Sequence, residues 1–299
     1  MPKNTTITLI ISLAAALGSS IAKKYYTKKG ESGSFGNFLF TAACSLISAC
    51  VLLIWSEFGE VSSFTVLLGL AFGAITTIQG IAHIAALQTG PLSYTAVIIS
   101  FSTLIPALSG ALFFGEGLSL SQIIGIVLML ISFLLATGKK TNETRANFKW
   151  LILCLIAFAA TGGIGVMQKI HQSSPHRAEL DEFLVIAFFA SSLLSLLILA
   201  FIKGRGEQKQ TRNGQWILFF LGITVLSGVC VAVNNKLNLY LSGVMDSAVF
   251  FPIVNGGGLV LTTLTAVILF RERLEKKQWV GVIIGILSVI FLCEPFPLS

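Results

Sequence analysis

Two ionisable side chains, His83 and Lys236, lie within long apolar stretches of the sequence. A charged group at the centre of a bilayer costs about 2.5–3.5 kcal/mol on insertion scales, so such groups usually face a polar cavity. The alternative is that both lie near a helix end and extend their polar ends to the lipid headgroups. The first interpretation predicts a binding site for a polar solute.

Side-chain amides accompany both residues. Gln79 lies four residues before His83, and Asn235 directly precedes Lys236. Asn255 precedes three consecutive glycines, which loosen a helix and let a substrate or another backbone approach closely. These side chains supply hydrogen bonds and charge, which are the means of holding a small polar metabolite. We therefore predict that the substrate is bound by Gln79, His83, Asn235, Lys236 and Asn255.

No enzyme motif accompanies these residues. The sequence contains no HExxH, no GxSxG and no Gly-Lys-Ser/Thr phosphate loop. The spacing of its five cysteines fits neither a disulfide framework nor a metal site. We predict that the chain is not an enzyme and uses no cofactor and no metal.

The elements that must position the predicted site are ten apolar segments. Hydrophobic residues make up 55% of the chain and charged residues 11%, whereas a soluble domain has about 25% charged residues. Most segments reach the roughly 20 residues that a helix needs to cross a bilayer, which predicts a multi-pass protein of the plasma membrane. The predicted spans are Thr6–Tyr25, Gly36–Ser56, Phe64–Gln88, Leu92–Phe114, Ser119–Thr137, Phe148–Ile170, Leu180–Ile202, Gln215–Leu241, Ser247–Phe270 and Gln278–Cys293.

The second half of the sequence repeats the first. Phe113–Ala136 aligns without a gap with Leu269–Leu292. Identical pairs include Glu116/Glu272, Gln122/Gln278, Gly125/Gly281 and Ser132/Ser288. Five spans per copy is an odd number, so the second copy enters the membrane upside down. The predicted fold class is an all-α membrane protein of ten transmembrane helices, built as two inverted five-helix repeats over residues 1–140 and 141–299.

The basic residues predict an orientation. Loops on one side of the ten spans hold sixteen of the 20 Lys and Arg residues. The positive-inside rule places these loops, including residues 141–145, in the cytoplasm and both termini outside. The net charge of +7 is explained by this bias, and we predict no nucleic-acid partner.

The repeated carboxylates Glu116 and Glu272 precede a predicted span in each copy. A carboxylate there favours the positive end of a helix, so we interpret both as structural caps rather than proton carriers. Ser119 with Gln122 fits a capping box at the start of the following helix.

These repeated stretches resemble a known family. Pro106 followed by Phe113-Phe-Gly-Glu116-Gly-Leu resembles the repeat signature of the EamA branch of the drug/metabolite transporter superfamily. Leu269-Phe-Arg-Glu272-Arg-Leu with Gly281 resembles its second copy. The resemblance implies a ten-helix basket whose central cavity works by alternating access. It also implies cytoplasmic termini, the reverse of what the charge count predicts.

The expected function is secondary active transport of small organic metabolites, with export as the direction that the resemblance implies. Relatives that expel cationic drugs use a carboxylate within the first helix, but no Asp or Glu stands in the middle of any predicted span here. A neutral, zwitterionic or anionic substrate is therefore favoured. The alternatives are multidrug efflux of lipophilic cations and a non-transporting membrane receptor or scaffold. The expected partners are the small-molecule substrate and membrane lipid, and the chain is expected to be a monomer or a homodimer.

Overall fold

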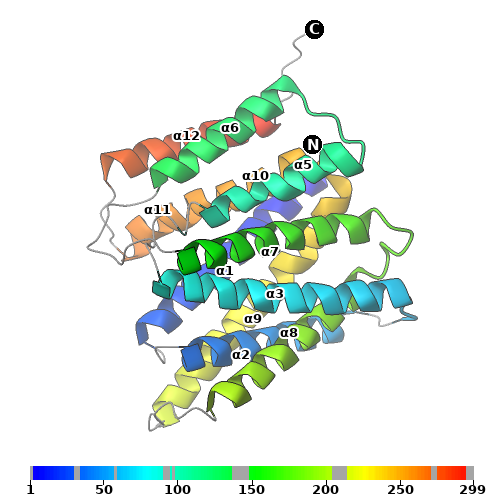
Figure 1. Ribbon diagram of the computed structural model, residues 1–299, viewed down its shortest axis with the longest axis vertical. Helices are drawn as coiled ribbons and strands as arrows, with labels where there is room; N and C mark the ends of the chain where they lie inside the picture. The colour runs from blue at the N-terminus through cyan, green and yellow to red at the C-terminus, as the bar shows by residue number, and fades with distance from the viewer. Residues whose placement is uncertain are drawn as a thin grey trace. The chain divides into compact units, whose positions relative to one another are not determined.

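The computed structural model describes residues 3–29, 34–56, 59–89, 95, 98–136, 148–203, 214–270 and 275–293, and every regular element within these ranges is helical. The first predicted half contains α1 (Lys3–Lys29), α2 (Ser34–Trp55), α3 (Ser63–Thr89), η1 (Phe101–Thr103), α5 (Leu104–Phe113) and α6 (Leu120–Ala136) (Figure 1). The second contains α7 (Phe148–Gln172), α8 (Leu180–Lys203), α9 (Gly214–Val244), α10 (Ser247–Pro252), η2 (Ile253–Gly257), α11 (Gly258–Phe270) and α12 (Lys276–Cys293).

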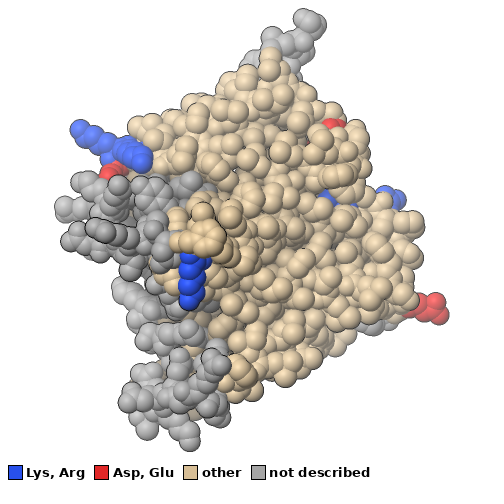
Figure 2. Space-filling view, viewed as in Figure 1, with Lys and Arg blue, Asp and Glu red and all other residues tan. Residues whose placement is uncertain are grey.

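The described helices overlap all ten predicted segments, and the start of the fourth, residues 92–94, lies outside the described residues. Among the described residues, eight helices are long and apolar enough to cross a membrane, and two shorter apolar helices cover Ile98–Phe113 and Leu120–Leu135. Large apolar side chains point outward from them, among them Ile54 at 86% exposure. Figure 2 shows broad areas of the described surface without a charged side chain. Such a surface is suited to lipid, where helices satisfy their own backbone hydrogen bonds. The prediction of an all-helical fold is confirmed for the described residues.

The chain divides into two compact units that alternate along the sequence. The first comprises Met1–Thr6, Ile78–Ser173 and Leu241–Ser299, and the second comprises Ile7–Thr77 and Ser174–Tyr240. Each unit contains segments from both predicted halves, and α1, α3 and α9 each pass from one unit into the other. The units are therefore a different division of the chain from the repeats, whose boundary stays a prediction.

In the first unit, α6 and α12 lie side by side (Figure 1). The Ser132 hydroxyl donates a hydrogen bond to the Gly281 carbonyl at 2.7 Å. The Ser288 hydroxyl donates to the Gly125 carbonyl, also at 2.7 Å. A Cβ atom on Gly125 would lie 2.7 Å from the Leu292 side chain, so glycine is what lets the two helices approach this closely. In the same unit, α5 packs against α7 and α10.

In the second unit, α2 packs against α8, and the Ser192 hydroxyl donates to the Ala42 carbonyl at 3.0 Å. The Ser48 hydroxyl joins α2 to α9 by donating to the Gly228 carbonyl at 2.8 Å. Small residues and hydroxyl groups thus connect these helices, as expected where lipid removes the hydrophobic drive for helix association.

The connection before α3 is held to the connection before α8. The Ser62 backbone N–H and hydroxyl donate to the Glu179 carboxylate at 2.9 and 2.7 Å. The Gly59 N–H donates to the Glu182 carboxylate at 3.1 Å. The His176 Nδ1 also lies 2.9 Å from the Glu179 carboxylate, within hydrogen-bonding distance. These contacts fix two helix starts in the second unit.

Candidate substrate-binding site

The ninth apolar segment is an interrupted helix. α10 ends at Pro252, a π-helical turn covers Ile253–Gly257, and α11 resumes at Gly258. Proline has no N–H to donate within the helix, and the consecutive glycines add little stiffness, so the regular hydrogen-bond pattern changes at this point. π-helical turns of this kind are frequent at functional sites.

The fourth segment, which is its counterpart in the predicted repeat, is also irregular. A 3₁₀ turn at Phe101–Thr103 precedes α5. The Asn255 side-chain amide donates a hydrogen bond to the Thr103 hydroxyl at 3.0 Å, so the two irregular turns contact each other. Paired interruptions in corresponding segments of the two halves are the strongest pointer to a transporter binding site.

Asn255 differs in exposure from its partner. Thr103 is buried, whereas Asn255 is exposed although it lies well inside an apolar segment. An amide exposed to hydrocarbon would leave polar atoms unsatisfied, which is costly. The exposed face of Asn255 is therefore suited to water or to a polar ligand.

Glycines on α7 allow the helices around this junction to approach closely. A Cβ atom on Gly165 would lie 2.9 Å from both Pro106 of α5 and Phe251 of α10. A Cβ atom on Gly162 would collide with the Ile105 side chain. These two glycines are thus required for helix packing, and they place α7 against the helices that carry Thr103 and Asn255.

The five predicted binding residues are divided between the units. Gln79 and His83 lie on α3 within the first unit, where both are half-buried, and Asn255 belongs to the same unit. Asn235 and Lys236 lie on α9 within the second unit, and both are half-buried. Their joint contribution to one cavity stays a prediction.

Lys236 has a carboxylate partner that sequence reasoning missed. Its ammonium lies 2.9 Å from each of the two carboxylate oxygens of Asp181, in the first turn of α8. The ammonium also lies 4.9 Å from the centre of the Trp55 ring, a cation–π contact. About a quarter of each charged side chain is exposed, so the pair is accessible as well as satisfied. The acidic first turn of α8 was the available signal in the sequence.

The other polar residues of α9 make contacts within the protein. The Asn234 amide donates to the Ser12 carbonyl of α1 at 2.9 Å, and the Ser12 hydroxyl donates to the Asn238 side chain at 2.5 Å. The Asn235 amide donates to the Val231 carbonyl of its own helix at 2.9 Å. Part of the polarity that suggested a cavity on α9 therefore joins α9 to α1.

Glu116 caps a helix, but not the helix that follows it. Its carboxylate accepts the Ser247 N–H at the start of α10 at 2.7 Å and forms an ion pair with Lys169. At the start of α6 the predicted capping box is confirmed, with Ser119 N–H donating to the Gln122 side chain at 2.9 Å. Glu272, the second predicted cap, lies outside the described residues.

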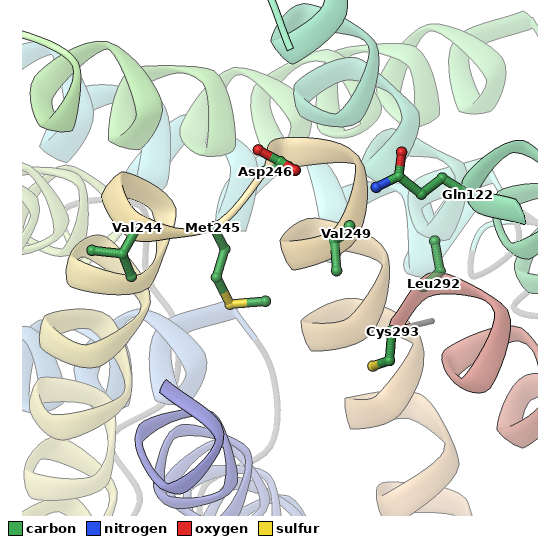
Figure 3. Close-up of a pocket in the computed structure, with 7 residues that line it drawn as sticks. All are labelled: Gln122, Val244, Met245, Asp246, Val249, Leu292 and Cys293. Atoms are coloured by element: carbon green, nitrogen blue, oxygen red, sulfur yellow. The ribbon is translucent and has the colours of Figure 1, made fainter. Parts of the chain in front are cut away.

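An open pocket of about 240 Å³ lies in the first unit, where the α9–α10 turn meets α6 and α12. Figure 3 shows Asp246 in that turn, with Gln122 of α6 and Cys293 of α12 on the other side of the pocket. The remaining lining is Val244, Met245, Val249 and Leu292. None of the five predicted binding residues lines it.

Comparisons with known proteins agree with this architecture. Residues 148–293 match the EamA-like transporter family. An uncharacterized protein of Haemophilus influenzae is 28% identical over 197 residues, which cover 64% of this chain and 62% of the relative. A solved protein crystal structure superposes with a TM-score of 0.73 at 14% identity, covering 97% of this chain and 96% of that one, and so shares its fold. The family match bears out the predicted resemblance to EamA-type transporters, and the long apolar helices agree with a multi-pass membrane protein.

Proposed function

We propose that this EamA-type membrane transporter is a secondary active exporter of small organic metabolites that works by alternating access. The observation that carries the proposal is the junction of the two irregular turns, where Asn255 donates to Thr103 at 3.0 Å. Irregular backbone at membrane depth is tolerated where it lines a cavity. Discontinuous helices form the substrate sites of many transporters, and the exposed amide of Asn255 offers a polar group at this break.

Two reciprocal hydrogen bonds support the proposed inverted repeat. Ser132 donates to Gly281, and Ser288 donates to Gly125. Each serine and each glycine is aligned with its counterpart in the repeat, so exchanging the two copies reproduces the same pair of bonds. Contacts that exchange in this way are those of a two-fold related pair. Two related halves can rock about one central site to open it on either side.

The substrate class follows from the charges near the membrane-spanning segments. We propose a neutral, zwitterionic or anionic metabolite held by Gln79, His83, Asn235, Lys236 and Asn255. Export of lipophilic cations is the competing function, and relatives that perform it use a carboxylate within the first helix, which α1 lacks. The carboxylate nearest to Lys236 is Asp181, which is already paired with it. The proposed partners are the substrate and lipid, without nucleic acid, in a monomer or homodimer.

Flux in proteoliposomes tests the proposal. Purified full-length chain is reconstituted, loaded with mixed amino acids and organic acids, and assayed under an imposed proton or sodium gradient. Gradient-dependent efflux of one component is expected. Absence of flux for every solute, or flux of ethidium alone, would refute the proposed substrate class.

A charge variant tests the role of Lys236. Lys236→Met alone would leave the Asp181 carboxylate unpaired, so the informative variant combines Lys236→Met with Asp181→Asn. We expect this double variant to insert and accumulate normally but to lose most transport of a charged substrate. Reduced abundance with normal flux per molecule would instead mean that the pair serves stability alone.

A further inference from the structure

A second charged pair lies at the turn between α9 and α10. Glu116 in the α5–α6 turn forms an ion pair with Lys169 in the last turn of α7. Their side chains are 8% and 11% exposed for lysine and glutamate respectively. An ion pair buried to this extent is costly unless its hydrogen-bonding atoms are satisfied.

The pair is satisfied by the two helix ends that it joins. Besides Glu116, the Lys169 ammonium donates to the carbonyls of Ser242 and Met245 at 3.0 and 3.3 Å, which uses all three of its donors. The second oxygen of Glu116 accepts the Ser247 N–H at 2.7 Å. The cation therefore lies at the C-terminal end of α9 and the anion at the N-terminal end of α10, as the helix dipoles require.

The backbone around Glu116 fits this arrangement closely. Gly115 has a φ of 69°, a left-handed conformation that favours glycine. The Glu116 N–H then donates back to the Gly110 carbonyl at 3.1 Å. A Cβ atom on Gly110 would collide with the Glu116 carboxylate and lie 2.7 Å from the Ser247 side chain. The α5–α6 turn is thus built to deliver one carboxylate to the start of α10.

We propose that Glu116 and Lys169 are positioning residues that hold the α9–α10 corner rigid, so that bending during transport occurs at the π-helical turn Ile253–Gly257. The corner holds only Met245 and Asp246 between the two helices. The next weak point along the chain is the interrupted helix that carries Asn255. Loosening the corner therefore changes how often the exposed side of Asn255 is accessible to water. This inference rests on the proposed transport function.

The polarity of the helix ends separates this pair from a simple ion pair. Exchanging the charges in the double variant Glu116→Lys, Lys169→Glu would place an ammonium against the Ser247 N–H. It would also place a carboxylate against two carbonyls. Charge reversal therefore restores the ion pair but not the hydrogen bonds to the ends of α9 and α10, which together form the clamp. Lys169→Arg retains both the ion pair and these hydrogen bonds.

The test is the accessibility of a cysteine beside Asn255. The full-length chain, with its five cysteines replaced by serine or alanine, carries Gly258→Cys, since a Cβ atom there meets nothing within 4 Å. Position 258 is the first residue of α11 and directly follows the π-helical turn that carries Asn255. The rate of labelling by a charged, membrane-impermeant methanethiosulfonate is measured in proteoliposomes, together with the melting temperature.

We expect Glu116→Gln and Lys169→Met to change the labelling rate about tenfold, and the charge-reversed double variant to remain altered. Lys169→Arg should label at the parent rate. Glu182→Gln is the matched control, since Glu182 is another buried carboxylate that accepts a backbone N–H, and its effect should stay within about twofold.

Unchanged labelling in Glu116→Gln and Lys169→Met, or full restoration by charge reversal, would overturn the inference. If the single variants fail to fold, the labelling rates of Lys169→Arg and of the charge-reversed double variant are compared. Equal rates in these two variants would overturn the inference. Parent protein that labels as expected but shows no gradient-driven flux would refute the transport function and leave the clamp standing.

Discussion

Glu179 should make the stability of this protein depend on pH in the acidic range. Its carboxylate accepts two hydrogen bonds from Ser62 and lies 2.9 Å from the Nδ1 atom of His176. Burial acts to raise the pKa of this carboxyl group, but hydrogen bonds from Thr65, Ser62 and His176 outweigh it and lower the pKa from 4.5 to about 2.

The direction of this pH dependence is set by whether the folded or the unfolded state binds the Glu179 proton more weakly. The folded protein keeps Glu179 ionised to a lower pH than the unfolded chain does. The stabilisation is therefore complete above pH 4.5 and is lost as the pH falls toward 2. The pKa difference sets an upper limit of about 3 kcal/mol. Because the side chain is 18% exposed, solvent screening reduces the expected contribution to about 1–2 kcal/mol.

The assay compares the melting of purified wild type and Glu179→Gln between pH 7 and pH 3. The variant should melt lower than wild type at pH 7, and the difference should shrink as the pH falls. Glu60→Gln is the matched control, because Glu60 is an exposed carboxylate in the connection before α3. A difference between wild type and Glu179→Gln that stays constant over this range, or is absent at pH 7, would refute the reasoning.

Two further pairs of substitutions give direct readouts. Gly110→Ala would collide with the Glu116 carboxylate and should lower the free energy of unfolding by about 1–3 kcal/mol; Gly117→Ala, which meets nothing within 4 Å, should melt as wild type, and equal melting of the two would contradict the packing argument. In a background without native cysteines, Ser173→Cys should react with impermeant thiol reagents in intact cells and Lys277→Cys should not, if the positive-inside rule sets the orientation; the opposite labelling would favour cytoplasmic termini.

Hydropathy predicted the positions of the helices because a bilayer imposes length and apolarity on each span. The largest difference among the described helix ends is in α1, which ends at Lys29 where Tyr25 was predicted. The break in the ninth segment was also foreseeable from its three glycines. Its π-helical form was not, because that depends on Pro252 together with tertiary packing.

Partner choice could not be read from the sequence, since it depends on tertiary structure. Glu116 was correctly interpreted as a cap, yet the helix that it caps begins 131 residues away. Lys236 was recognised as unusual, yet its partner Asp181 lies 55 residues away at the edge of another span. Local patterns show that a charge needs compensation, and the fold decides which group provides it.

The hydrogen bonds and ion pairs already made within the protein give an order of importance to three of the five predicted binding residues. Asn235 already donates to its own helix, and Lys236 is paired with Asp181, so a substrate must displace those contacts before it can use either side chain. The Asn255 side-chain amide donates one hydrogen bond to Thr103, and the residue remains exposed at a break in its helix. Its carbonyl oxygen and second N–H are the groups most readily offered to a ligand. Substitution of Asn255 should therefore reduce transport more than substitution of Asn235, and the reverse order in the same flux assay would move the binding site away from the interrupted helices.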